Sequence, residues 1–237
     1  MLVIAHRGAS GHAPENTMAS FLRAIAMGAK AIELDVHQTL DHELVVAHDD
    51  DLRRCGGGDK RRLKNVHWDD VSTHDVGAWF DKSFKGERLP RLEDVYDILP
   101  KSVELHVELK HGSAVYPGIE ERVVDLIHKR GAQARTLVSS FDHAALYSVR
   151  SIDEKVRLGY LLGLTTLKTA FREMKDIAAE SLNLSARQTL ARTVKAAHER
   201  DYKVLVYTVN APADRDRLAK LGVDGIFSNY PELDIWR

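Results

Sequence analysis

Four short stretches of the chain each contain two side chains that are suited to catalysis or to binding of ions. Two of them hold a histidine, and two histidines around one centre suit general acid–base catalysis near neutral pH. The other two hold carboxylates, which are hard oxygen ligands that suit Mg²⁺ or Ca²⁺ more than zinc. An arginine and a lysine beside them supply fixed positive charge, which suits a phosphate group. The pairs are His6-Arg7, Glu33-x-Asp35, His48-Asp49 and Glu108-x-Lys110.

The elements that must position these pairs alternate along the chain. Helical periodicity is seen at 16–28, 116–131, 186–201 and 211–222, with glycines at several helix ends. The alternation predicts an α/β fold, a (β/α)8 barrel, with a doubly wound open sheet as the alternative. In such a barrel the active site lies at the carboxyl ends of the strands, where the four pairs fall. Strands are predicted at 2–5, 31–36, 43–48, 103–109, 136–141, 156–162, 181–185, 203–209 and 225–229.

The carboxylates and histidines also have structural explanations. Alternating charged and apolar residues are typical of any half-buried strand, and a histidine at a strand end is more often structural. The apolar neighbours of the acids favour function, because Leu34, Val36, Val107 and Leu109 would face the helix layer and turn the acids into the barrel. Charges are rarely buried there unless they are paired or bind a metal. The chain's ten other histidines are interpreted as surface or core residues.

Two places depart from the alternation. Only "HQTLDH" separates the second and third strands, so these strands are expected to form a hairpin that turns at Asp41-His42 and sets Asp35 roughly opposite His48. Residues 50–88 are rich in glycine and charge and are predicted to be an insertion over the strand ends. The insertion aromatics Trp79, Phe80 and Phe84 either contact substrate or form a small core of their own.

Composition limits the class of protein. We expect a single domain over residues 1–237, with 44% hydrophobic and 29% charged residues. A formal net charge of -1 argues against a nucleic-acid partner. The single cysteine, Cys55, is expected to be a bystander in a reducing compartment, and the apolar N-terminal run is too short for a signal peptide or a membrane span. These features predict a cytoplasmic protein without stable membrane insertion.

Six short motifs, "AHRG", "PENT", "ELDV", "VVAHD", "VELK" and "YTVN", occur in this order along the chain. In these motifs the chain resembles the glycerophosphodiester phosphodiesterase family, and the resemblance runs from about residue 4 to residue 231. It implies a distorted TIM barrel like that of the phosphoinositide-specific phospholipases C, with an insertion after the third strand. It further implies metal-dependent hydrolysis of small glycerophosphodiesters to sn-glycerol 3-phosphate and an alcohol, by way of a cyclic phosphate.

The resemblance also implies roles for single residues. Glu33, Asp35 and Glu108 would bind the divalent cation, Mg²⁺ or Ca²⁺, His6 and His48 would be the acid and the base, and Arg7 and Lys110 would hold the phosphate. Glu15 would complete the metal or substrate shell, although an acid beside the first helix is also favoured by the helix dipole alone. Tyr207 would form an aromatic wall where the family often has tryptophan.

Some positions and functions stay open. The turn that usually reads Asp-Gly is Asp41-His42, and the usual "ITDYP" is Phe227-Ser228-Asn229-Tyr230-Pro231, a change expected to touch no metal-binding or proton-transferring residue. Alternative functions are a lysophospholipase D of the same fold and a barrel that binds phosphodiesters without hydrolysing them. The order in which the histidines act, the headgroup and the oligomeric state are left open.

Overall fold

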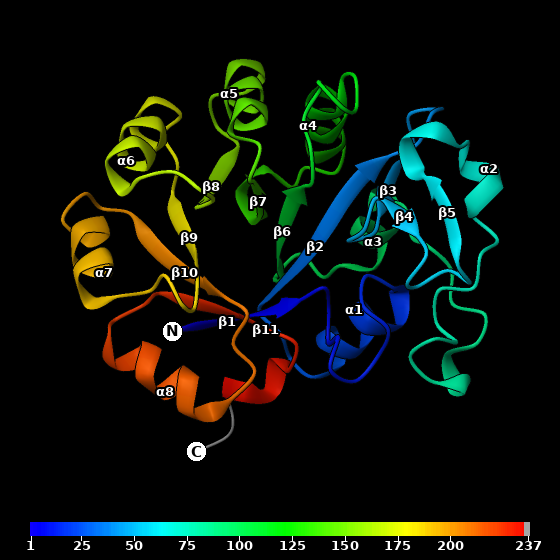
Figure 1. The fold of residues 1–237 in the computed structure, drawn as a ribbon, viewed down its shortest axis with the longest axis horizontal. Helices are drawn as coiled ribbons and strands as arrows, with labels where there is room; N and C mark the ends of the chain where they lie inside the picture. Colours follow the sequence, from blue (N-terminus) through cyan, green and yellow to red (C-terminus); the bar gives the residue numbers. More distant parts are fainter. Residues whose placement is uncertain (235–237) are drawn as a thin grey trace.

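The computed structural model describes residues 1–234, which form a closed barrel of parallel strands surrounded by helices (Figure 1). Eight strands follow one another around the barrel in the order β1-β11-β10-β9-β8-β7-β6-β2, and β1 pairs with β2 to close it. The barrel prediction is confirmed, and the open sheet is excluded by this closure. The strands are β1 (Leu2–His6), β2 (Ala31–Gln38), β3 (Leu44–Val46), β4 (Asp51–Leu52), β5 (Asp59–Arg62), β6 (Glu104–Leu109), β7 (Thr136–Ser140), β8 (Arg157–Leu161), β9 (Ser181–Ser185), β10 (Lys203–Tyr207) and β11 (Gly225–Ser228).

An α-helix lies between each pair of consecutive barrel strands, and after β11 the described chain ends in a short 3₁₀ turn. The four segments with helical periodicity are helices, each shorter than predicted by a few residues at its ends. The α-helices are α1 (Met18–Ala26), α2 (Trp68–Val71), α3 (Leu92–Ile98), α4 (Ile119–Lys129), α5 (His143–Ile152), α6 (Leu167–Asp176), α7 (Ala191–His198) and α8 (Pro212–Lys220), and the 3₁₀ helices are η1 (Leu63–Asn65), η2 (Lys82–Phe84), η3 (Gln133–Arg135) and η4 (Pro231–Asp234).

The start of α1 shows how local chemistry shapes the chain beside the site. Thr17 caps the helix, because its side chain accepts from the backbone N–H of Ser20 at 3.3 Å, while the Ser20 hydroxyl accepts from the Thr17 N–H. Thr17, and not its neighbour Asn16, is therefore the N-cap residue of α1. The buried face of the helix carries Phe21 and Ala24, which pack in the main core between the barrel and its helices.

The predicted hairpin is present, with a register that differs by one residue from the expected one. β2 and β3 are antiparallel, and Val36 lies opposite Val46. Ala47 donates its backbone N–H to the Asp35 carbonyl at 3.1 Å, so Ala47 rather than His48 lies opposite Asp35. The difference matters because side chains alternate between the faces of a strand, so one residue decides which face His48 takes. His48 lies beyond the end of β3 and lines the barrel mouth.

The insertion predicted at 50–88 contains the two-stranded sheet β4–β5 and short helical turns (Figure 1). Its apolar side chains form a core apart from that of the barrel, with Leu52, Leu63 and Val76 among the buried members. Trp79, Phe80 and Phe84 contact one another edge to face, with ring centroids 5.8 and 5.7 Å apart. Within the described chain none of the three lines the barrel cavity, so these aromatics form a cluster of their own.

Candidate active site

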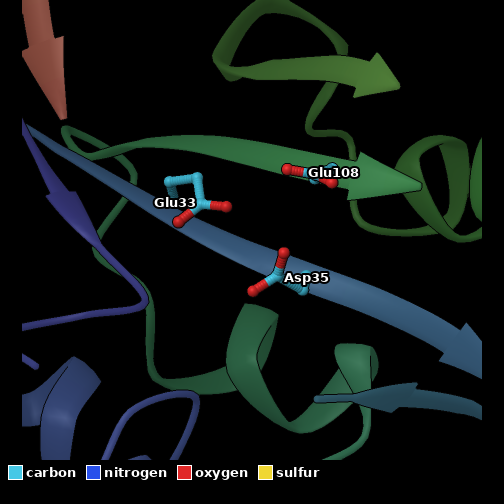
Figure 2. A group of neighbouring side chains, drawn as sticks. All are labelled: Glu33, Asp35 and Glu108. Carbon is cyan, nitrogen blue, oxygen red and sulfur yellow. The ribbon is translucent and has the colours of Figure 1, made fainter. Parts of the chain in front are cut away.

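The register of β2 and β6 brings three carboxylates together inside the barrel (Figure 2). Asp35 and Glu108 are paired across the two parallel strands, and Glu33 lies two residues before Asp35 on the same face. One carboxylate oxygen from each of the three lies within 4.8 Å of the others. The side chains of Glu33 and Asp35 are buried and that of Glu108 is 13% exposed, as the inward orientation of the acids predicted.

The electrostatics of these carboxylates fit a bound cation. Burial and the charges of Asp35 and Glu108 raise the pKa of Glu33 well above its ordinary value. Burial and Asp35 likewise raise the pKa of Glu108 to about 6. A cation shared by the three groups would compensate for both effects, and an all-oxygen donor set is the one that Mg²⁺ and Ca²⁺ prefer. The residues present therefore fit a hard divalent cation.

Asp35 differs because three side chains hold it in its charged form. Burial alone would raise its pKa, but Lys110 and Arg7 together bring that pKa down to about 2. Lys110 Nζ lies 3.2 Å from Asp35 Oδ1 and 2.9 Å from Glu108 Oε1, and Arg7 Nε lies 3.3 Å from Asp35 Oδ2. Asn16 also donates to Asp35 Oδ2 at 2.9 Å, a contact that the sequence reasoning missed. The only sequence signal for Asn16 is its place in "PENT". In the structure it has a positive φ of 55°.

Arg7 occupies a strained turn between β1 and α1. Its φ is 56°, and Gly8 follows at 79°, a conformation that suits glycine. The turn aims the Arg7 backbone N–H at Glu33 Oε2, 2.9 Å away, and the guanidinium at Glu15 and Asp35. Glu15 precedes the helix and accepts from Arg7 Nη1 at 2.9 Å. Glu15 therefore contacts Arg7, and the first turn of the helix itself holds no acid.

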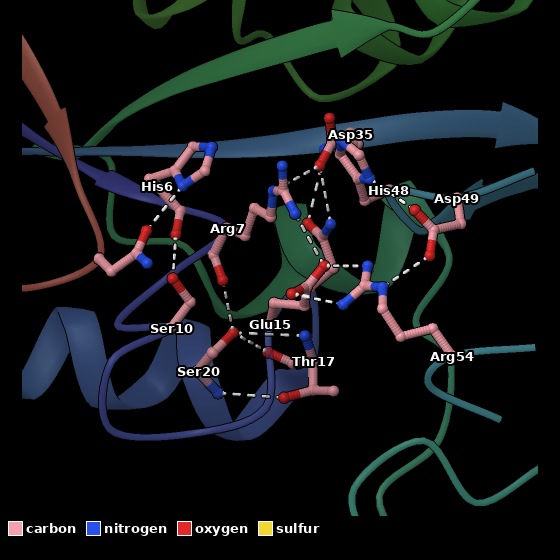
Figure 3. Close-up of polar contacts among 12 residues, drawn as sticks. His6, Arg7, Ser10, Glu15, Thr17, Ser20, Asp35, His48, Asp49 and Arg54 are labelled. Atoms are coloured by element: carbon pink, nitrogen blue, oxygen red, sulfur yellow. Dashed lines mark hydrogen bonds and ion pairs between the residues drawn. The ribbon is translucent and has the colours of Figure 1, made fainter. Parts of the chain in front are cut away.

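The two histidines face one cavity and have different partners (Figure 3). His6 Nδ1 lies 2.7 Å from Asn229 Oδ1, an amide oxygen that can only accept, so Nδ1 carries the proton. His48 Nδ1 lies 2.7 Å from a carboxylate oxygen of Asp49. Burial and the charge of Arg7 lower the pKa of His6 to about 4, which keeps its ring neutral at pH 7. The expectation that Asn229 touches no proton-transferring residue is wrong, because β11 delivers Asn229 beside the end of β1.

A single cavity of about 140 Å³ joins these groups at the carboxyl ends of the barrel strands. One side of it is charged and the other apolar, with Phe141 and Tyr207 in edge-to-face contact, their ring centroids 6.2 Å apart. The predicted residues His6, Arg7, Glu33, His48, Glu108, Lys110 and Tyr207 line it, together with Ser139, Phe141, Leu161, Asn183, Thr208 and Phe227. Asp35 and Glu15 do not line the cavity, but both contact Arg7, which does. Phe141 was missed because it is an apolar residue at the end of a predicted strand, and the sequence reasoning looked for charged residues there.

Two other features bear on earlier expectations. Burial raises the pKa of Cys55 to about 12, so the thiol stays protonated at neutral pH and is a poor nucleophile, as expected of a bystander. No helix within residues 1–234 is long and apolar enough to cross a membrane.

Comparisons with known proteins agree on one family. A model described as the glycerophosphoryl diester phosphodiesterase family matches residues 6–233. A glycerophosphodiester phosphodiesterase of Caldanaerobacter subterraneus is 34% identical over 232 residues, which cover 98% of this chain and 95% of the relative. The structure of an Oleispira antarctica phosphodiesterase in complex with the product sn-glycerol-3-phosphate has a TM-score of 0.92 and 28% identity, covering 98% of this chain and 94% of that one. A glycerophosphodiester phosphodiesterase from Agrobacterium tumefaciens has a TM-score of 0.85 and 28% identity, with 98% of each chain covered.

Proposed function

The chain belongs to the glycerophosphoryl diester phosphodiesterase family and hydrolyses glycerophosphodiesters, and on this premise we propose how its residues perform the reaction. The products are sn-glycerol 3-phosphate, which the Oleispira relative holds, and a free alcohol. The observation that carries the proposal is the single cavity lined by both histidines, both cationic side chains and two of the three clustered carboxylates.

Glu33, Asp35 and Glu108 would hold one Mg²⁺ or Ca²⁺ between them. Such an ion polarises the phosphoryl oxygens and neutralises part of their charge when it is bound. Arg7 and Lys110 add fixed positive charge from the same side of the cavity. Phe141 and Tyr207 form the apolar wall, against which the carbon atoms of glycerol or of the leaving alcohol pack.

The partners of the two histidines assign their first roles. His6 is neutral, with its proton on Nδ1, so Nε2 has a free lone pair and can act as the base. It takes the proton of the glycerol hydroxyl next to the phosphate, and that oxygen attacks phosphorus to form a cyclic phosphate. His48 Nδ1 contacts the Asp49 carboxylate, which orients the imidazole ring toward the leaving group, and we assign His48 as the acid that gives a proton to the departing alcohol. Water then opens the ring with the two histidines in exchanged roles.

The setting of the reaction belongs to the same proposal. We assign the barrel and the insertion to one catalytic domain, since the Ala19 backbone N–H in α1 donates to Glu87 of the insertion at 3.2 Å. A single cysteine suits a reducing compartment, which supports a cytoplasmic location. The small net charge supports a small-molecule partner over a nucleic acid.

The test begins with release of glycerol 3-phosphate from glycerophosphocholine by the wild-type protein. EDTA should abolish the release, and added Mg²⁺ or Ca²⁺ should restore it. Release that persists after chelation would contradict the role of the carboxylates. If only lysophospholipids are cleaved, the lysophospholipase D alternative replaces this substrate assignment, and metal-dependent binding without turnover would leave the non-catalytic binder.

A change of leaving group separates the two histidines. A 4-nitrophenyl ester of glycerol phosphate needs little protonation of its leaving group, so His48→Gln should regain much of its lost rate of 4-nitrophenol release in the first turnover on this substrate. His6→Gln should stay inactive on both substrates, because the attacking hydroxyl still needs a base. The opposite pattern would exchange the two assignments.

A further inference from the structure

The insertion places an arginine between two carboxylates at the edge of the site (Figure 3). Arg54 follows β4 and donates two parallel hydrogen bonds to Glu15, from Nη1 to Oε2 at 2.9 Å and from Nη2 to Oε1 at 2.8 Å. Its Nε donates to Asp49 Oδ2 at 2.7 Å. One planar guanidinium thus contacts two acids that come from different parts of the chain.

Each of these acids has a second contact, and both second contacts reach the cavity. Asp49 Oδ1 lies 2.7 Å from His48 Nδ1, and Glu15 Oε1 lies 2.9 Å from Arg7 Nη1. Arg54 itself does not line the cavity that holds the two histidines. It is therefore the common partner of two pairs and touches neither the proposed acid nor the proposed phosphate ligand.

From this geometry, and resting on the proposed function above, we propose that Arg54 is a positioning residue for the hydrolysis. It holds Asp49 against His48 and Glu15 against Arg7 at the same time. The segment 50–88 is then part of the catalytic apparatus, because it supplies the group that orients the acid and the phosphate clamp together.

The physical reason lies in exposure and in the shape of the guanidinium. The Asp49 and His48 side chains are 34% and 33% exposed, so nothing but their contacts prevents them from turning toward water. An arginine offers five N–H donors in a fixed plane, which allows one side chain to serve two carboxylates. A lysine ammonium is a flexible point charge and could keep one of them in place.

The main experiment compares three full-length variants at saturating Mg²⁺ on glycerophosphocholine. Arg54→Gln should lower kcat about 10- to 100-fold, the range expected when a catalytic group is misplaced by about 1 Å. Arg54→Lys should recover only part of that loss. Arg53→Gln is the matched control, because Arg53 is also exposed and, within residues 1–234, forms an ion pair only with Asp51, with Nη2 3.1 Å from Oδ2. The kcat of this variant should stay at the wild-type value.

Two readouts separate positioning from a merely structural contribution. On the 4-nitrophenyl substrate Arg54→Gln should lose less, because part of its defect passes through the acid His48. In a double-mutant cycle, Arg54→Gln and Asp49→Asn should be strongly non-additive in kcat, since both changes free the same imidazole. If Arg54 had only a structural role, its replacement would lower kcat equally on the two substrates, and the effects of the two substitutions on kcat would be additive.

The outcomes are distinct for the two proposals. An active wild type whose Arg54→Gln variant folds and keeps its kcat overturns the role of Arg54 alone. A loss in Arg54→Gln that is matched by Arg53→Gln, or that follows the melting temperature, also overturns it. A wild type that releases no glycerol 3-phosphate with any metal overturns the proposed function first. If Arg54→Gln does not fold, the test is the kcat of Arg54→Lys and of Asp49→Asn, each measured on glycerophosphocholine and on the 4-nitrophenyl substrate.

Discussion

Replacing Asn229 by aspartate tests the assignment of His6 as the base. The change keeps the size of the side chain and puts a carboxylate where an amide oxygen now lies 2.7 Å from His6 Nδ1. At about 4 Å between charge centres and an effective dielectric constant near 20, the attraction to an imidazolium is about 4 kcal/mol. At about 1.36 kcal/mol per pKa unit this is about 3 units, the upper end of the usual 1–3 units for such a neighbour.

The sign of the effect follows from the form of His6 that is active. The pKa of His6 is lowered to about 4 by burial and by Arg7, so the neutral base is present at pH 5 and above. A higher pKa of His6 in Asn229→Asp keeps the ring protonated over a wider range of pH. The acid limb of the kcat/KM profile should therefore move to higher pH by about 1–3 units. With a shift of two units, the neutral fraction at pH 5 falls about tenfold.

The assay is the pH profile of kcat/KM between pH 4 and 8 at saturating metal, with folding checked by circular dichroism at each pH. Asn229→Ala is the control, because it removes the acceptor without adding charge and should lower activity without moving the limb upward. An Asn229→Asp profile that coincides with that of the wild type would refute the assignment of His6 as the base. Equal upward shifts in both variants would show that charge is not the cause.

Three further outcomes follow from the structure. A metal concentration of about 100 times the Kd should raise the free energy of unfolding of the wild type by about 2.7 kcal/mol, or its melting temperature by roughly 5–10 °C. Glu33→Gln should lose this increase. A wild-type melting temperature that does not respond to Mg²⁺ or Ca²⁺ would count against the metal site. Arg157 is the main cause that lowers the pKa of Glu180 to about 2 from 4.5, so their pair stabilises the fold above pH 4.5 and is lost as the pH falls toward 2. After a discount for screening by solvent, Arg157→Gln should lose on the order of 1 kcal/mol in the free energy of unfolding by urea at pH 7, and the loss should fade as the pH falls through about 2. A loss that does not depend on pH would disprove the linkage. A Cβ at Gly8, where φ is 79°, would collide with the Ser20 side chain in α1, so Gly8→Ala should lower the free energy of unfolding by about 1–3 kcal/mol and reduce activity. Gly28 has a similar φ of 80° but open space around it, so Gly28→Ala should lose less stability and stay active.

The sequence by itself determined the class of fold and most of the charged residues of the site. Alternating apolar runs and helical segments predicted the barrel, and the barrel predicts that residues after strand ends meet at one mouth. Glu33, Asp35 and Glu108 could be identified because charged residues between buried apolar neighbours on a strand must point inward. This reasoning needs only local pattern, since the period of a strand is the same in every fold.

The tertiary structure decided which partner each of these residues has. Asn229 meets His6 only because β11 lies beside β1, 223 residues apart in the chain. Arg54 meets Glu15 only because the insertion folds back over the start of α1, 39 residues away. Such contacts depend on strand order, on register and on the path of a loop, and no local periodicity encodes them. The charges of the site could be predicted from the sequence, but the neutral state of His6 and the contacts that hold His48 in place depend on the packing of distant segments.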